Sequence, residues 1–94
     1  MLFAVICTDR PASLDLRPAT RPAYLATYAD RVVQGSPLLD TDGRPCGTLL
    51  LTDVENHAAA EGFAASDPCA RAGLFESTVM RAHRTVLRDG EVVA

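Results

Sequence analysis

The residue of this chain best suited to acid–base chemistry is Asp67, in the segment Ser66-Asp67-Pro68. The segment follows an alanine-rich stretch and precedes a β-rich one, so it should form a turn between two rigid elements, where catalytic groups are often held. A carboxylate in that place is a candidate general base. The same residues are also typical of a helix stop, or of the N-cap of a short following turn, and Asp67 would then be only structural.

The other side chains that react or bind metals are three cysteines and two histidines. The cysteines are widely separated, at Cys7, Cys46 and Cys69. They therefore form neither a disulfide framework nor a Cys-x-x-Cys pair. Cys69 lies close to the Asp67 turn and is either a nucleophile or an incidental thiol. The surroundings decide between the two, because reactive cysteines need an exposed, electropositive setting. His57 and His83 have no partner at ligand spacing, so we predict no metal site and no cofactor.

Length and charge limit the class of protein. The 94 residues suit one domain, residues 1–94, with a thin core. The net charge is −3 and the nine arginines are dispersed, which argues against a nucleic-acid partner. The longest apolar runs, Leu2 to Cys7 and Leu49 to Leu51, are far shorter than the ~20 residues of a membrane span. No leader opens the sequence, and we expect a cytoplasmic protein with no membrane partner.

Apolar periodicity predicts the elements that position these side chains. The first half should contain a strand over Leu2–Cys7, a helix from Pro22 to Gln34 that ends at Gly35, a short strand over Ser36–Leu39, a turn over Asp40–Gly43 and a returning strand over Cys46–Thr52. The second half should contain a helix over Val54–Ala65, capped by Thr52 or Asp53, and a strand over Phe75–His83 that residues 84–87 extend. Residues from about 88 to 94 should be a flexible or partner-contacting tail.

The order strand, helix, strand, strand, helix, strand is that of the ferredoxin-like split βαβ fold. We therefore expect an α+β protein with a βαββαβ antiparallel sheet and two helices on one face. The other face of the sheet needs a cover in a chain of this size. A second copy stacked sheet against sheet would supply it, so we predict a homodimer.

One stretch of the chain carries a family resemblance. The segment Arg17-Pro18-Ala19-Thr20-Arg21-Pro22-Ala23-Tyr24-Leu25 resembles the R-x-x-x-R-P-x-H-L signature of the YciI-like family. The likeness continues in Gly47 to Leu51, in Ala58-Ala59 before Phe63 and in Ser66 to Glu76. It spans the chain from Leu2 to about Leu87. The resemblance implies a small ferredoxin-like domain that dimerises into an α/β barrel, in agreement with the order of elements.

The resemblance also implies a chemistry. The family pairs the histidine of the signature with the aspartate of the Asp-Pro turn as an acid/base dyad, and a few relatives eliminate chloride from hydroxyquinone-type or lactone-type rings. Asp67 matches the aspartate, but Tyr24 occupies the histidine position. An unperturbed phenol titrates at about 10, so Tyr24 would orient a substrate or donate a hydrogen bond, and Asp67 would be the only base. Alternatively, Tyr24 is a packing residue.

Three further residues complete the predicted site. Arg17 and Arg21 match the two family arginines, and they either bind an anionic carboxylate or phenolate or are solvated charges. His83, where many relatives have a bulky aromatic residue, replaces the lost imidazole only if it faces the same cleft. Two functions remain open. One is an enzyme for proton abstraction or elimination on an anionic ring compound, and the other is a non-catalytic ligand-binding or accessory dimeric domain.

Overall fold

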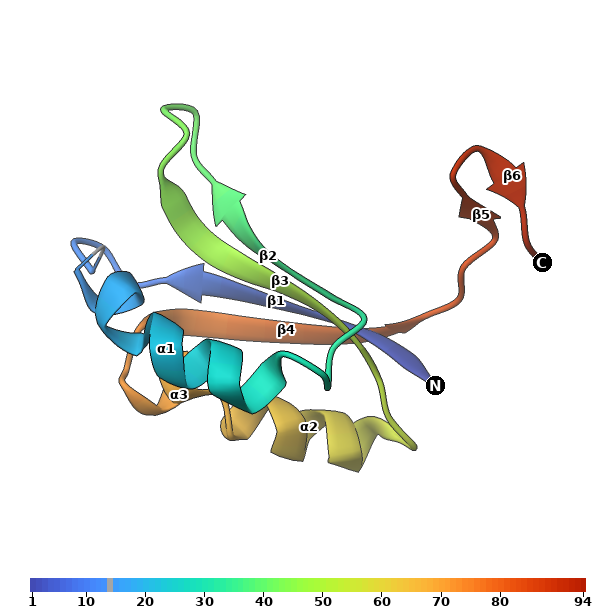
Figure 1. Cartoon of the computed structure of the whole chain (residues 1–94), viewed down its shortest axis with the longest axis horizontal. Helices are drawn as coiled ribbons and strands as arrows, with labels where there is room; N and C mark the ends of the chain where they lie inside the picture. The colour runs from blue at the N-terminus through green and yellow to red at the C-terminus, as the bar shows by residue number, and fades with distance from the viewer. Residues whose placement is uncertain (14) are drawn as a thin grey trace.

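The protein is built on a four-stranded antiparallel sheet with helices on one face (Figure 1). The computed structural model describes residues 1–13 and 15–94. The strands, in the order β2-β3-β1-β4, are β1 (Leu2–Asp9), β2 (Gln34–Leu39), β3 (Pro45–Asp53) and β4 (Phe75–His83). The helices are α1 (Leu16–Tyr28), α2 (His57–Ala65) and the short α3 (Pro68–Arg71). This confirms the expected α+β, ferredoxin-like fold. None of these described helices is long and apolar enough to cross a membrane.

Strand β1 lies inside the sheet, and its side chains alternate between two different faces. Val5 and Cys7 are buried under the helices, whereas Ile6 is 41% exposed on the opposite side. The neighbouring strands continue both faces, because Val5 is paired with Leu50 of β3 and Ile6 with Val79 of β4. The side without helices is here called the open face, and it includes Ala4, Ile6, Leu49, Leu51, Val79 and Arg81.

The core lies between the other face of the sheet and the helices. Its buried cluster comprises Val5, Cys7, Tyr28, Leu50 and Phe63. The rings of Tyr28 on α1 and Phe63 on α2 have centroids 4.6 Å apart. The Tyr28 hydroxyl also donates a hydrogen bond of 2.7 Å to the Phe63 carbonyl. One side chain therefore joins both long helices through packing and through a buried polar contact.

Helix α1 occupies a different stretch from the one that the sequence predicts. The predicted helix from Pro22 to Gln34 is wrong at both ends, because α1 runs from Leu16 to Tyr28 with Pro22 inside it. Pro18 lies in the first turn, where a missing N–H has no intrahelical partner to lose. Pro22 is in the interior and removes one backbone hydrogen bond, which the packing of Tyr28 offsets.

The end of α1 is set by the sheet. The Val33 N–H donates to the Leu51 carbonyl at 2.8 Å, immediately before β2 starts. Gly35 is paired with Leu50 inside β2 rather than capping the helix. Pairing with β3 therefore competes successfully with continuation of the helix. This long-range competition is not visible in the local pattern.

Helix α2 begins three residues later than the predicted Val54. Its N-cap is Asn56, whose side-chain oxygen accepts a first-turn backbone N–H at 2.8 Å. The predicted caps, Thr52 and Asp53, do not cap α2, because both belong to β3, which extends to Asp53. The Asp53 carboxylate instead accepts a hydrogen bond of 2.7 Å from the N-terminal ammonium group. The end of β3 is thus fixed by its pairing with the start of the chain.

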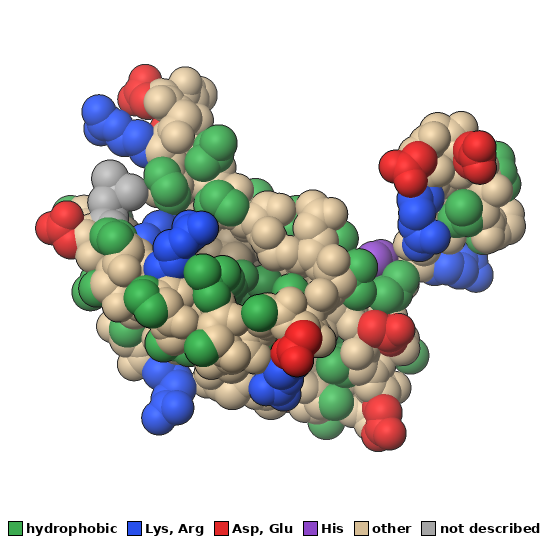
Figure 2. Space-filling model, in the orientation of Figure 1, with side chains coloured by type: hydrophobic (Ala, Val, Ile, Leu, Met, Phe, Trp, Pro, Cys, Tyr) green, Lys and Arg blue, Asp and Glu red, His purple; other side chains and the backbone are tan. Residues whose placement is uncertain are grey.

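The chain after β4 forms a small hairpin of its own. The predicted extension of β4 is wrong, since the strand ends at His83. Within the segment that follows, β5 (Leu87–Arg88) pairs with β6 (Glu91–Val92). Residues 84–94, here called the C-terminal arm, stand away from the sheet and helices (Figure 1). In the space-filling view this segment is a separate lobe with hydrophobic, basic and acidic side chains on its surface (Figure 2).

Replacing Tyr28 with phenylalanine tests the contact between the two long helices. Tyr28→Phe removes the hydrogen bond to Phe63, whose carbonyl still accepts one from Ser66 at 2.8 Å. The expected loss is therefore about 0.5–1.5 kcal/mol in the free energy of unfolding, measured by urea denaturation. Tyr24→Phe is the matched control, because the Tyr24 hydroxyl has no hydrogen bond within the described residues. Equal losses in the two variants would contradict the assignment.

Candidate functional site

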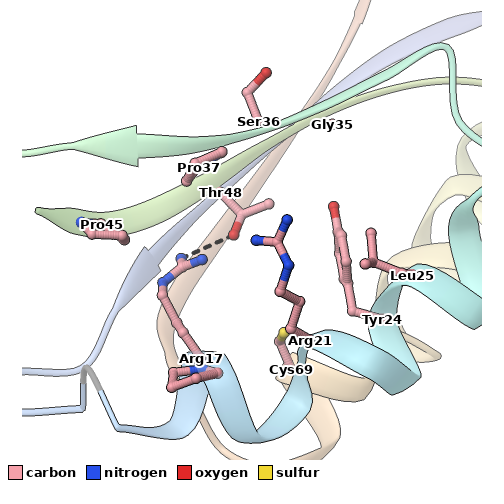
Figure 3. A pocket seen from close by; sticks show the side chains of 11 residues that line it. Arg17, Arg21, Tyr24, Leu25, Gly35, Ser36, Pro37, Pro45, Thr48 and Cys69 are labelled. Carbon is pink, nitrogen blue, oxygen red and sulfur yellow. Dashed lines mark hydrogen bonds between the residues drawn. The ribbon is translucent and has the colours of Figure 1, made fainter.

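A pocket of about 350 Å³ lies between α1 and the β2–β3 hairpin (Figure 3). Its polar wall consists of Arg17, Arg21, Tyr24, Thr48 and Cys69. Leu25, Pro37 and Pro45 belong to its apolar wall. The pocket therefore combines cationic and hydroxyl groups with apolar surface, a lining suited to a small organic anion.

Arg17 is already committed to a partner in the protein. Its guanidinium is bidentate on Asp9, with Nε 2.6 Å and Nη2 2.7 Å from the two carboxylate oxygens. The same Nη2 donates to the Thr48 hydroxyl at 3.0 Å. Both side chains of the ion pair are largely shielded from water. Arg17 thus ties the first turn of α1 to the ends of β1 and β3, and most of its charge is neutralised.

Arg21 is one helical turn beyond Arg17 and has no such partner. Figure 3 shows its guanidinium group directed from α1 toward β2 and β3, beside the ring of Tyr24. It forms no ion pair with any residue in 1–13 or 15–94. An exposed, unpaired guanidinium on a pocket wall is available for a carboxylate or phenolate. Of the two predicted arginines, Arg21 is the one free to bind an anion.

Tyr24 lies between the pocket and the core. Its ring packs edge-on against Tyr28, with centroids 5.3 Å apart. Its hydroxyl lies against Gly35, where a Cβ would come within 2.9 Å of the oxygen. Burial, with a contribution from the Asp67 charge, raises the pKa of Tyr24 to about 12. The phenol therefore stays protonated near neutral pH, so it is a hydrogen-bond donor and not a base.

Cys69 brings α3 to the pocket wall. Its side chain is buried, and its sulfur is 3.2 Å from the Thr20 hydroxyl on α1. Burial is the main cause that raises the pKa of the Cys69 thiol, and the nearby Asp67 charge adds to it. The thiol is thus protonated at neutral pH. It lacks the lowered pKa of a reactive cysteine, which favours the incidental thiol over the nucleophile.

Asp67 is fully buried, and its side chain is not part of the pocket wall, to which Cys69, two residues further on, belongs. It is the N-cap of α3, since one carboxylate oxygen accepts the Cys69 N–H at 2.8 Å. The other oxygen, Oδ2, is buried without a hydrogen-bond partner among the described residues. Burial raises the pKa of Asp67, against the opposing effects of the Cys69 N–H and thiol, the nearby Ala70 N–H and the Arg17 charge. Ionising Asp67 therefore costs stability as pH rises from the ordinary value of 3.8 through the raised pKa.

His83 lies away from this site. It is the last residue of β4 and pairs with Leu2 across the sheet, two positions along from Arg81. Strand alternation therefore places it on the open face, while the pocket is on the helical side. Its Nε2 is buried with no partner within residues 1–13 and 15–94. Within one chain, His83 does not join the residues that line the pocket.

The sequence prediction omitted two residues of the site, Asp9 and Thr48. Asp9 ends β1 and Thr48 lies on β3, where it pairs with Cys7. Their contact with Arg17 depends on where β1 and β3 lie relative to α1, which the sequence did not predict. Two histidines and three cysteines offered no metal cluster in the sequence, and the described residues contain no group of three His, Cys, Asp or Glu side chains that would hold a metal ion.

Comparisons with known proteins find curated relatives of nearly the same length. Protein YciI of Escherichia coli O6:H1 and protein YciI of Shigella flexneri are each 26% identical over 97 aligned residues. Each alignment covers 92% of this chain and 99% of the relative.

A solved structure shares the fold at a higher identity. It is 5-chloro-2-hydroxyhydroquinone dehydrochlorinase (TftG) from Burkholderia phenoliruptrix AC1100, in complex with 2,5-dihydroxybenzoquinone. The two proteins are 29% identical with a TM-score of 0.81, over 89% of this chain and 94% of the other. The model of the YCII-related domain matches residues 1–83. The chain therefore belongs to the YCII-related, YciI-like family.

Proposed function

We propose that this protein is a small-molecule enzyme that abstracts a proton from an anionic ring compound and thereby promotes elimination. The observation that carries the proposal is the buried Asp67 carboxyl group, whose Oδ2 has no hydrogen-bond partner among the described residues and whose pKa is raised by burial. Unsatisfied buried polar atoms are uncommon in native proteins and are costly to maintain. Carboxyl groups with pKa values shifted by burial concentrate at functional sites.

The proposed reaction divides its tasks among three side chains. In the keto tautomer of such a ring the carbon that bears chlorine is tetrahedral, and ionised Asp67 takes a hydroxyl proton from this tautomer. The O–H electron pair becomes a C=O bond, a ring double bond shifts, and the C–Cl bond breaks to release chloride. Arg21 pairs with the anionic oxygen of the substrate. The protonated Tyr24 hydroxyl donates a hydrogen bond to a substrate oxygen. Cys69 lines the pocket and the buried Asp67 does not, so side chains must move for the substrate to reach the carboxylate.

The relative of known activity supports the choice of substrate class. TftG is a dehydrochlorinase of a chlorinated hydroxyhydroquinone and was solved with a dihydroxybenzoquinone. A substrate of that size suits a pocket of about 350 Å³. The apolar wall at Leu25 and Pro37 would contact the ring, and Arg21 would contact its ionised oxygen.

We also propose that the functional form is a homodimer in which two open faces stack. Ile6 and Val79 on that face are 41% and 47% exposed. A second copy would remove this apolar surface from water and form a layer of two packed sheets. Sedimentation equilibrium at tens of micromolar tests this pairing, and a mass of 10.0 kDa for the species in solution would contradict it.

A ligand-binding domain without catalysis is the second candidate. The observation that favours it is Tyr24, which stands where the family signature has a histidine and whose pKa of about 12 excludes base catalysis near neutral pH. The cleft would then retain its anion-binding group, Arg21, without proton transfer. Binding of 2,5-dihydroxybenzoquinone with no turnover of any ring substrate would select this function over the enzyme.

The Asp67→Asn variant tests the enzyme directly. Chloride release from 5-chloro-2-hydroxyhydroquinone should fall by about 100- to 10,000-fold in kcat, the usual contribution of a general base. Tyr24→Phe should lower it by no more than about tenfold, because one neutral hydrogen bond is lost. Asp30→Asn, at an exposed aspartate after α1, is the matched control and should leave the rate unchanged. An Asp67→Asn enzyme as fast as the wild type would refute the role of Asp67.

Substitutions of the two arginines should have different effects, one on ligand binding and the other on the free energy of unfolding. Arg21→Gln should weaken binding of 2,5-dihydroxybenzoquinone about tenfold or more, measured by calorimetry, since a charged hydrogen bond contributes about 1.5–3 kcal/mol. Its free energy of unfolding should not change, because Arg21 is exposed and unpaired in the described chain. Arg17→Gln should instead lower stability by about 3 kcal/mol, because it leaves Asp9 shielded and unpaired. Loss of stability in both variants would show that Arg21 is structural as well.

A further inference from the structure

The C-terminal arm is built as a defined hairpin. Asp89 and Gly90 have φ angles of 52° and 77°, the two consecutive positive values of a type I′ turn. The strands pair on both sides of this turn, and the Val93 N–H donates to the Val86 carbonyl at 2.9 Å. An aspartate in the left-handed region is strained relative to glycine. The arm is thus a specific local structure and not a fraying terminus.

No part of its own chain within residues 1–13 and 15–83 covers this hairpin. No hydrogen bond joins residues 84–94 to residues 1–13 or 15–83. Its four large apolar side chains are exposed, Leu87 by 64% and Val92 by 75%, with Val86 and Val93 about half exposed. A lone two-stranded hairpin is at best marginally stable in water. The arm therefore requires a surface to pack on.

The shape of the chain indicates where that surface lies. In Figure 1 the β2–β3 turn at one end of the sheet and the arm at the other both rise on the side away from the helices. The arm follows directly from β4, which is an edge strand of the sheet. Between the two projections lies the open face, with Ile6 and Val79 exposed. A body of sheet-like shape fits between them, and a second copy of this chain has such a sheet.

The charges match a second copy as well. The arm carries two arginines, Arg84 and Arg88, and two acids at its tip, Asp89 and Glu91, and the open face carries Arg81. Neither acid nor Arg81 has an ion-pair partner in the part of its own chain that the structure describes. Acidic groups brought by the partner would lie near an unpaired arginine. The arm also lies beyond residues 1–83, the part that matches the family domain.

We propose that the C-terminal arm of each chain packs across the open face of a second copy, so that two chains exchange their arms. Leu87 and Val92 cover apolar side chains of the partner sheet. Each chain then contacts its partner at two places, through the stacked sheets and through the arm, and the arms stabilise the pair. This proposal rests on the homodimer proposed above, and it adds the segment that sets the strength of that homodimer.

Sedimentation velocity across a concentration series tests the arm. Leu87→Asp and Val92→Asp should each raise the dimer dissociation constant at least tenfold, because a charge replaces an apolar contact. Val33→Asp is the matched control: Val33 is also 64% exposed, but it lies between α1 and β2, outside the arm. Circular dichroism confirms that each variant is folded. A full-length dimer that all three variants leave unchanged would overturn the arm proposal and leave the homodimer standing.

Hydrogen exchange tests whether the arm packs on its own chain or on the partner chain. In the full-length protein, the Val93 amide should exchange slowly well above the dissociation constant and at the rate of an open chain well below it. Slow exchange at both concentrations would mean that the arm packs on its own chain, which overturns the proposal. A full-length protein that stays monomeric overturns both the arm exchange and the homodimer. The role of Asp67 is decided separately, by the chloride-release assay.

Discussion

The alternation of side chains along β1 is the constraint on which the rest of the structure depends. β1 lies between β3 and β4, so its two faces become the two faces of the sheet. Val5 and Cys7 fix the side that α1 and α2 must cover, and Tyr28 and Phe63 meet there. Ile6 on the other side leaves an apolar surface without a helix. The core, the pocket above it and the open face all follow from this one alternation.

The two arginines of the pocket wall have different roles, one structural and one available for binding, because only the charge of the first is neutralised by an observed ion pair. Two arginines one helical turn apart look equivalent in the sequence. Among the described residues, however, Arg17 meets a carboxylate and Arg21 does not, because β1 ends at Asp9 beside the first turn of α1. The ion pair and the Thr48 hydroxyl hold that turn against the sheet. Arg21 is left as the free cation of the wall. Asp67, by contrast, is buried and does not line the pocket, and its Oδ2 has no partner among the described residues, a state that favours the neutral carboxyl group.

The sequence predicted the strands and the topology well, because apolar runs, the alternation in Phe75–His83 and the Asp-Gly turn are local signals. It misplaced α1, since Pro22 resembles a first helical residue and the competing pairing of Val33 with β3 is long-range. It identified Arg21 and Tyr24 as pocket residues, through the family signature. It could not show that Arg17 is neutralised by Asp9 or that His83 lies on the other face of the sheet, because both depend on strand register. The sequence predicted the arm only as an extension of the preceding strand followed by a tail.

The central claim is that Asp67 is a carboxyl group kept in a poorly solvated place beside the pocket, ready to accept a proton once ionised. Titration of its side-chain carboxyl carbon by ¹³C NMR tests this most directly, with the signal assigned by its absence in Asp67→Asn. The midpoint should lie clearly above the ordinary value of 3.8, and it should change when 2,5-dihydroxybenzoquinone binds. A midpoint at or below that value, unaffected by the ligand, would show that Asp67 is only the cap of α3.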